Sequence, residues 1–129
     1  MTEVIQNLFI GNWHEARDAQ GMYVVTVAID SEFIGHEHFK LIDGPGNNVE
    51  EFCNAVDSVC KAHRNGDKVL VHCVGGRSRS AAVIVAAVTV LTGTSLLNAY
   101  DALIYKHDFT GSGARIHPYL SLILLEKYE

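Results

Sequence analysis

The sequence lacks the features that mark several large classes of protein. Three cysteines at irregular spacing do not make a disulfide framework. The longest uninterrupted apolar run covers residues 81–88, far short of the ~18 residues that a membrane-spanning helix needs. The acidic, weakly apolar start Met1-Thr2-Glu3 does not look like a secretory signal. We therefore expect a reducing, intracellular location in the cytoplasm, with no membrane span.

Positive charge is also scarce, since 10 Lys and Arg residues face 15 Asp and Glu residues, for a net charge of −5. This balance argues against a broad nucleic-acid or anionic membrane surface. The 129 residues are 48% hydrophobic and 19% charged, and contain no repeat, linker or low-complexity stretch. These values are typical of an ordinary globular chain. We expect residues 1–129 to form one domain, and the protein to be a monomer.

One segment near the middle of the chain carries the most specific chemistry, His72-Cys73-Val74-Gly75-Gly76-Arg77-Ser78-Arg79-Ser80. An apolar run at residues 68–71 predicts a buried strand before it, and residues 81–91 predict a helix after it. A glycine-rich turn from strand to helix directs backbone N–H groups inward and adds the positive end of the helix dipole. The segment therefore predicts a cradle for a phosphate-like anion.

The side chains of this segment suit covalent phosphate chemistry. Cys73 at the base of the cradle is expected to be largely thiolate near neutral pH and to act as the nucleophile. The planar fork of Arg79 can hold two phosphate oxygens at once. Ser80 places a hydroxyl near the sulfur, and His72 is expected to bond to the backbone and hold the loop. The predicted substrate-binding residues are Val74, Gly75, Gly76, Arg77, Ser78 and Arg79.

Cleavage of a phosphate ester also needs an acid that protonates the leaving oxygen. Asp43 is the candidate, because it ends a predicted strand at residues 39–42 and precedes Gly44-Pro45-Gly46, a loop able to move over the pocket. Alternatively, Asp43 only begins a turn or caps a helix. The other candidate acids are Asp30, Glu32 and Asp108.

The motif resembles the signature of the cysteine-based protein tyrosine phosphatases, which is His-Cys, five residues, Arg, then Ser or Thr. The match is complete, and the Ser78-Arg79-Ser80 ending and short chain look most like the dual-specificity branch. Leu8-Phe9-Ile10-Gly11 is similar to the opening strand of that branch. Leu41-Ile42-Asp43, followed by Asn48-Val49, resembles its acid loop and the next helix.

The resemblance implies a cysteinyl-phosphate intermediate and an acid about thirty residues before the cysteine, which is the position of Asp43. It implies phosphotyrosine, phosphoserine and phosphothreonine as substrates, and neither a metal nor another cofactor. Arg77 and Gly75 depart from the usual pattern. An extra guanidinium would favour a substrate with several phosphates, unless Arg77 pairs with a neighbouring carboxylate on the rim.

Three alternatives stay open at this point. The enzyme could act on a phosphoinositide, a nucleotide or an RNA 5′-phosphate. The cradle could serve a phosphate-binding adaptor with little turnover. Cys73 could also be an inert buried cysteine in a structural turn.

The remaining pattern predicts an α/β fold with a small central mixed, mostly parallel sheet of about four to five strands flanked by helices. The predicted strands are 8–10, 23–29, 39–42 and 68–71. The predicted helices are 13–20, a helix from Val49 that Asn48 caps and that ends before residue 65, then 81–91, 95–107 and one from Pro118 toward Lys127.

Weaker signals concern metal binding, substrate contact and oxidation. His36-Glu37-His38 resembles a pair of metal ligands but lacks a third, so a solvated loop is favoured. Arg115 could reach a substrate or be an ordinary surface residue. Cys53 and Cys60 share the apolar face of one helix and are most simply core, although one of them could pair with an oxidised Cys73.

Overall fold

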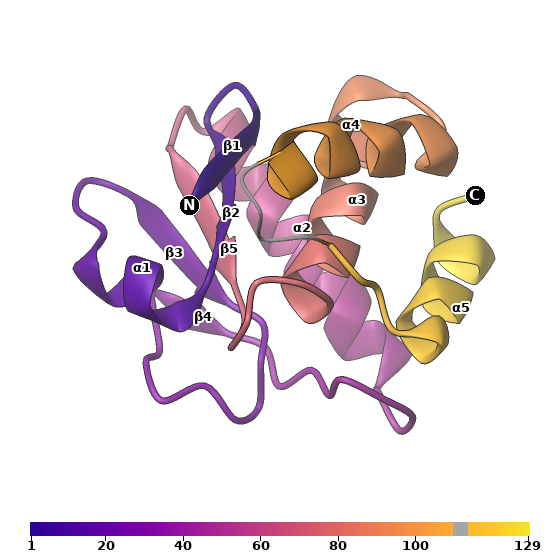
Figure 1. Ribbon diagram of the computed structural model, residues 1–129, viewed down its shortest axis with the longest axis horizontal. Coiled ribbons are helices and arrows are strands. Elements are labelled where there is room, and N and C mark those ends of the chain that lie inside the picture. Colours follow the sequence, from indigo (N-terminus) through magenta and orange to yellow (C-terminus); the bar gives the residue numbers. More distant parts are fainter. Residues whose placement is uncertain (110–113) are drawn as a thin grey trace.

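Five short strands form one sheet in the order β1-β2-β5-β3-β4 (Figure 1). The computed structural model describes residues 1–109 and 114–129, and of residues 108 and 109 only the backbone. β1 runs antiparallel to β2, and the other neighbours are parallel. The expected mixed, mostly parallel sheet is therefore confirmed. The strands are β1 (Thr2–Ile5), β2 (Leu8–Gly11), β3 (Tyr23–Thr26), β4 (Glu37–His38) and β5 (Val69–His72).

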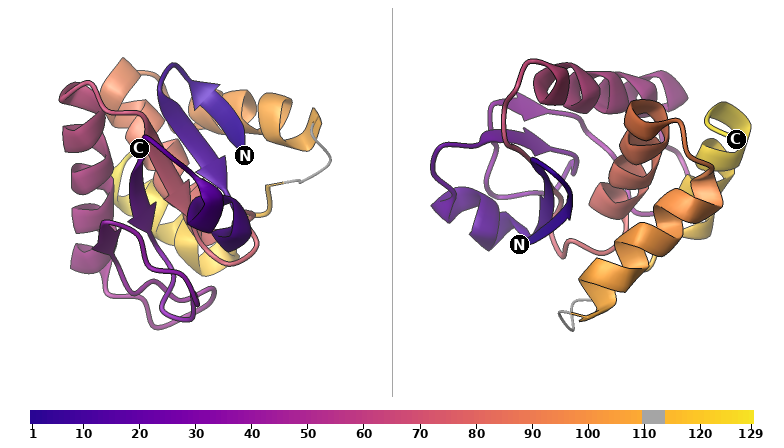
Figure 2. Two further views of the ribbon diagram at one scale, coloured as in Figure 1. Left: turned by 90° about the vertical axis from the view of Figure 1, so that its left-hand side faces the viewer. Right: turned by 90° about the horizontal axis from the view of Figure 1, so that it is seen from above.

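Helices cover both faces of this sheet, as expected for parallel strands that are buried on both sides. The short α1 lies on one face, and the other four helices lie on the opposite face (Figure 2). The helices are α1 (Trp13–Asp18), α2 (Val49–Arg64), α3 (Arg79–Thr92), α4 (Leu96–Phe109) and α5 (Pro118–Lys127). No helix of the described residues is long and apolar enough to cross a membrane.

The central helix α3 packs against α2, α4, α5 and β5. Every residue of α3 from Arg79 to Val88 is buried, and most of them are alanine or valine. Small side chains let the neighbouring elements approach the helix from all sides, which explains why its sequence is apolar nearly all round. This packing fixes the start of α3, and with it the end of the loop that follows β5.

Capping residues set the starts of three helices. The Asn48 side chain accepts a hydrogen bond from the backbone of Glu51, which confirms it as the cap of α2. His117 caps α5 directly before Pro118. α1 begins with a full capping box between Asn12 and Glu15, which was not predicted from the sequence.

The strand predicted at residues 39–42 is wrong, because the fourth strand is β4 at Glu37–His38. Phe39 N–H still donates to the carbonyl of Thr26 in β3, but Lys40 N–H donates to the side chain of Glu51, and Ile42 N–H donates to that of Asn47. β1 was missed, and β3 ends at Thr26, three residues earlier than predicted. The sequence at residues 109–113, Phe-Thr-Gly-Ser-Gly, predicts a loop, but these residues lie outside the described part apart from Phe109, which ends α4.

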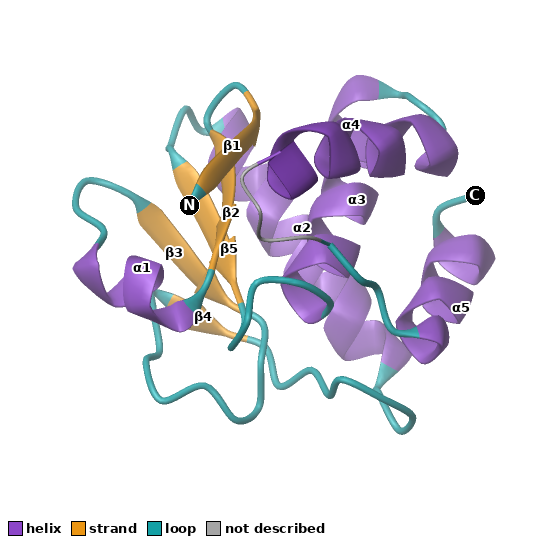
Figure 3. Cartoon of the chain, in the orientation of Figure 1, coloured by secondary structure: helices purple, strands orange, loops and turns teal. Residues whose placement is uncertain are grey.

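The parallel strands all end at one edge of the sheet, where long connecting loops gather (Figure 3). Ligands of open α/β sheets bind outside the carboxyl ends of parallel strands. The His72-to-Ser80 segment leaves β5 at this edge, so the fold sets the predicted phosphate loop in the place where such sites form.

Candidate active site

Residues 74–78 form the turn between β5 and α3, here called the phosphate loop. Across the described residues, no backbone N–H group from Val74 to Arg79 donates to a protein acceptor. Buried or half-buried N–H groups almost always find a partner. A run of such donors at a helix start is therefore suited to the oxygens of a tetrahedral anion.

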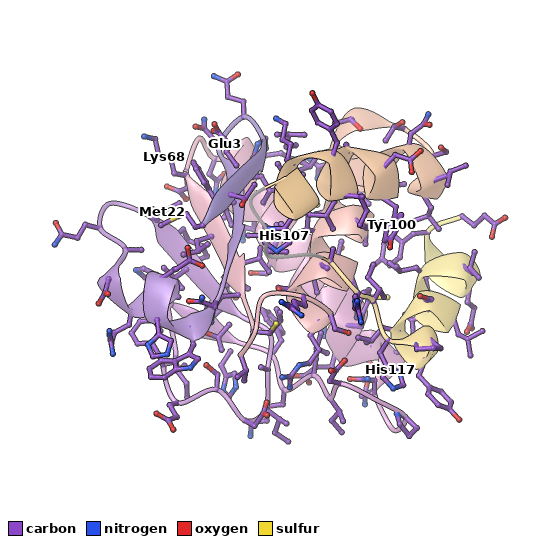
Figure 4. All side chains as sticks on the ribbon, in the orientation of Figure 1. Glu3, Met22, Lys68, Tyr100, His107 and His117 are labelled. Carbon is purple, nitrogen blue, oxygen red and sulfur yellow. The ribbon has the colours of Figure 1, made fainter. Side chains whose placement is uncertain are left out.

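The carbonyls of the same loop are held by three segments that are distant in the sequence. Val74 O accepts from the backbone of Trp13 at 3.4 Å, and Arg77 O accepts from the backbone of Arg115 at 2.6 Å. Gly76 O accepts from Nε2 of His107 at 2.8 Å, and His107 projects from the end of α4 toward the middle of the molecule (Figure 4). These contacts fix the loop from three sides, while its N–H groups have no acceptor among the described residues.

Gly76 has a backbone that only glycine adopts easily. Its φ angle is +71°, and an added Cβ would lie 2.9 Å from the carbonyl oxygen of Gly11. Gly75 differs, because an added Cβ there would meet no atom within 4 Å. The two glycines, which look equivalent in the sequence, therefore have different roles, and only Gly76 is required by the backbone.

Cys73 lies at the base of the loop and is only 3% exposed. Its sulfur is 3.2 Å from the hydroxyl oxygen of Ser80, which is fully buried in the first turn of α3. The structure thus brings together the candidate nucleophile and the hydroxyl predicted to assist it. A hydroxyl at this distance can donate a hydrogen bond to a thiolate.

His72 belongs to a buried chain of hydrogen bonds that ends at the nucleophile. Gly35 N–H donates to the hydroxyl of Thr26 at 2.8 Å, and this hydroxyl lies 2.6 Å from Nε2 of His72. Nδ1 of His72 then donates to the carbonyl of Cys73 at 3.0 Å. A neutral imidazole satisfies this pattern, with Nε2 accepting from the Thr26 hydroxyl, and burial lowers the pKa of His72. Thr26 was not singled out from the sequence.

Arg79 is buried, with 7% of its surface exposed, and its Nη1 atom has two acceptors. These are Oδ1 of Asp30 at 2.5 Å and the carbonyl of Leu41 at 3.3 Å. The hydrogen bond from Arg79 lowers the pKa of Asp30. Asp30 was considered from the sequence as an acid, but a carboxylate that accepts a hydrogen bond from a guanidinium is held ionised and has no proton to give.

Asp43 lies in the segment between β4 and α2, two residues beyond Leu41. Its side chain is exposed and has no hydrogen bond or ion pair among the described residues. The side chain of Asn47 closes this loop, accepting from Ile42 N–H at 2.8 Å and donating to the carbonyls of Ile42 and Gly44. Asn47 was not singled out from the sequence.

The other candidate residues are exposed or have structural partners. Arg77 and Arg115 are both exposed, and the structure contains no ion pair of either within its described residues. His36 accepts from Val24 N–H, and His38 bonds to the carbonyl of Ala28, so both rings support the fold around β4. No group of potential metal ligands is found in residues 1–109 and 114–129. Glu32 is exposed, and the side chain of Asp108 lies outside the described part.

The contact that Cys60 makes argues against a disulfide with Cys73 in this fold. Its sulfur contacts the carbonyl of Ala87, two helical turns beyond Ser80, which corresponds to about 10 Å along α3. A disulfide requires Cα atoms within ~7 Å of each other. Pairing between Cys73 and Cys53 stays a prediction.

Residues 25–115 match the family model described as "Dual specificity phosphatase, catalytic domain". A dual specificity protein phosphatase of vaccinia virus, OPG106, is 27% identical over 140 residues, covering 99% of this chain and 82% of the relative. The crystal structure of a single-residue variant of human DUSP28 is 26% identical with a TM-score of 0.82, covering 99% and 92% of the two chains. That of Tk-PTP in the active form is 25% identical with a TM-score of 0.75, covering 96% and 92%.

These matches cover the sheet edge, the phosphate loop and the segment that carries Asp43. The viral relative is described as a protein phosphatase, so the comparisons favour neither the non-protein substrates nor the adaptor role considered from the sequence. The matched catalytic domain implies that this chain acts on phosphorylated molecules by the chemistry of a cysteine-based phosphatase. The chain belongs to the dual specificity phosphatase family.

Proposed function

We propose that the chain hydrolyses phosphotyrosine and also phosphoserine and phosphothreonine in proteins, with Cys73 as the nucleophile. The observation that carries this proposal is the run of free N–H groups around a buried sulfur that contacts Ser80. A phosphate bound by these donors would hold its phosphorus above the Cys73 sulfur. The dipole of α3 and the N–H groups favour the thiolate and the negative charge of the transition state.

In the first step, the Cys73 thiolate attacks phosphorus and a sulfur–phosphorus bond forms as the bond to the leaving oxygen breaks. Asp43 donates its proton to that oxygen. The exposed Asp43 carboxyl has no protein partner in the described chain, so it is available to a substrate. Asn47 holds the loop that carries Asp43 through hydrogen bonds to the backbone of Ile42. Arg79 and the loop N–H groups bind the equatorial oxygens.

In the second step, Asp43, now a carboxylate, removes a proton from a water molecule. The water attacks phosphorus, inorganic phosphate forms, and the sulfur of Cys73 leaves as a thiolate. Ser80 donates a hydrogen bond to this sulfur as its charge returns. His72 keeps the Cys73 carbonyl in position from behind the loop.

We further propose that residues 1–129 act as one monomeric catalytic domain in the reducing cytoplasm. The three free cysteines are compatible with such a compartment. The net charge of −5 disfavours a broad nucleic-acid surface. Sedimentation would test whether the protein is a monomer, and cell fractionation of the tagged protein would test its location.

The test of the catalytic proposal is hydrolysis of p-nitrophenyl phosphate across pH with EDTA present. We expect activity in the wild type, none in Cys73→Ser, and a fall of about 100-fold in Asp43→Asn. A fully active Cys73→Ser variant would refute the nucleophile. A fully active Asp43→Asn variant would refute the acid while leaving the nucleophile in place, and phosphopeptides with each of the three residues would then rank the substrates.

A further inference from the structure

The guanidinium of Arg79 divides its donors between the protein and the phosphate loop. A guanidinium has five N–H bonds in a planar fork. Nη1 uses its two for Asp30 and for the carbonyl of Leu41. Nε and Nη2 have no acceptor among the described residues. This second edge is the one that can bind two oxygens of an anion side by side.

We propose that Asp30 is a positioning residue that holds Nη1 of Arg79, so that the Nε and Nη2 edge faces the bound phosphate. Asp30 itself touches neither the phosphate nor the leaving group. The inference rests on the proposed function, since it assigns the partner of a residue that the mechanism uses. It also removes Asp30 from the candidate acids.

The geometry of the pair supports fixation of the guanidinium instead of a loose surface contact. The Arg79 side chain is 8% exposed, while that of Asp30 is 62% exposed. A buried cation has few other ways to be neutralised, so the single carboxylate at 2.5 Å sets its orientation. Exposed pairs, by contrast, rarely fix either partner.

The second acceptor of Nη1 extends this contact to the loop of the proposed acid. The carbonyl of Leu41 also accepts from the backbone of Ile29 at 3.0 Å, next to Asp30 in the chain. Asp30 and Leu41 therefore approach Arg79 from two segments that are tied to each other. Asp43 follows two residues later, so the contact relates the position of the phosphate-binding arginine to that of the acid.

A negative charge beside Arg79 has a second possible effect, which the experiment must separate. A carboxylate close to the site repels a phosphate dianion and could compete with it for Arg79. A competitor weakens phosphate binding, and its removal would strengthen binding. A positioning residue strengthens binding of the transition state, and its removal would weaken that binding.

The test compares Asp30→Ala, Asp30→Asn and Asp30→Glu with the wild type. We expect Asp30→Ala to lower kcat for p-nitrophenyl phosphate about tenfold while KM stays within about threefold. Inhibition by vanadate, which copies the transition state, should weaken about tenfold, and inhibition by phosphate should weaken less, by about threefold. The kcat of Asp30→Glu should return close to that of the wild type, and the kcat of Asp30→Asn should lie between those of Asp30→Ala and the wild type.

Asp18→Ala is the matched control, because Asp18 forms an exposed ion pair with its neighbour Arg17, which is not a residue of the phosphate loop. It should behave like the wild type. If Asp30→Ala keeps its kcat, or binds phosphate and vanadate more tightly, the positioning role is overturned. Equal losses in Asp30→Ala and Asp18→Ala would also overturn it.

A binding measurement separates this inference from the proposed function. Calorimetry with tungstate in the Cys73→Ser background needs no turnover. Weaker tungstate binding after Asp30→Ala supports the inference even if hydrolysis by the wild type is absent, a result that would refute only the proposed function. Unchanged tungstate binding together with unchanged kcat refutes only the inference.

Discussion

The hydroxyl oxygen of Ser80 lies 3.2 Å from the sulfur of Cys73 across the base of the phosphate loop. The phosphate loop therefore brings the first turn of α3, which carries Ser80, back beside the sulfur of Cys73. A neutral donor in this position has little to do while sulfur attacks. Its hydrogen bond gains strength when sulfur must leave with a full negative charge.

We predict that Ser80→Ala slows the second step more than the first. The rate of turnover of p-nitrophenyl phosphate should fall about 10- to 100-fold, because one charge-assisted hydrogen bond is lost. Rapid mixing should then reveal a burst of one nitrophenol per enzyme before the slow phase. Ser80→Thr keeps the hydroxyl and should show no burst. A Ser80→Ala enzyme that is slow without a burst would contradict this assignment.

We predict that Gly76→Ala abolishes activity and Gly75→Ala does not. The φ angle of +71° and the Gly11 carbonyl at 2.9 Å leave no place for a methyl group at residue 76. Activity should fall at least ~100-fold, since small misplacement of catalytic groups has large effects. Gly75→Ala should stay within about threefold. Circular dichroism checks that both variants are folded, and equal activities would refute the distinction.

We predict that burial of the neutral His72 ring makes the stability of the protein decline at acidic pH. Its folded pKa is lowered, so below about pH 6.5 the unfolded chain takes up a proton that the folded chain resists. Stability from this residue is therefore complete above that pH and declines as pH falls toward the folded pKa. The largest slope is about 1.4 kcal/mol per pH unit.

Urea unfolding at pH 7.5 and at pH 5.5 measures this dependence. His72→Gln should lose about 1 kcal/mol less between the two pH values than the wild type does. Since the variant can also be unstable, the titration of the His72 ring by NMR in the wild type gives a second readout. A ring that titrates at or above the ordinary pKa of histidine would contradict the prediction.

We predict that Arg77 favours substrates with a second phosphate. Its guanidinium is exposed on the loop, and the backbone of Arg115, another exposed arginine, bonds to its carbonyl. Arg77→Ala should lower kcat/KM for a doubly phosphorylated peptide about five- to tenfold, while kcat/KM for the singly phosphorylated form stays within about twofold. If the ratio of kcat/KM between the two peptides is unchanged in Arg77→Ala, Arg77 does not determine substrate specificity.

Local patterns predicted the elements around the site well, because each is defined by neighbouring residues. The apolar run before His72, the glycine-rich turn and the buried helix after it required no long-range information. The same holds for the Asn48 cap and for Pro118 at the start of α5. The fold class was confirmed for this reason.

The failures come from long-range contacts. Residues 39–42 alternate in burial as a strand would, with Leu41 fully buried, yet side chains of Glu51 and Asn47 take up the backbone donors of Lys40 and Ile42. Only the folded chain brings those partners near. The contact between Asp30 and Arg79 joins residues 49 positions apart, and no spacing rule selects Asp30 over other carboxylates.

The three carbonyl contacts of the phosphate loop have a consequence for synthesis of the protein. Trp13 precedes the loop, but His107 and Arg115 leave the ribosome well after Cys73. A nascent chain therefore contains Cys73 before it contains the residues that hold the phosphate loop in place. We therefore expect activity to begin only after the end of α4 and the segment that carries Arg115 have reached the phosphate loop.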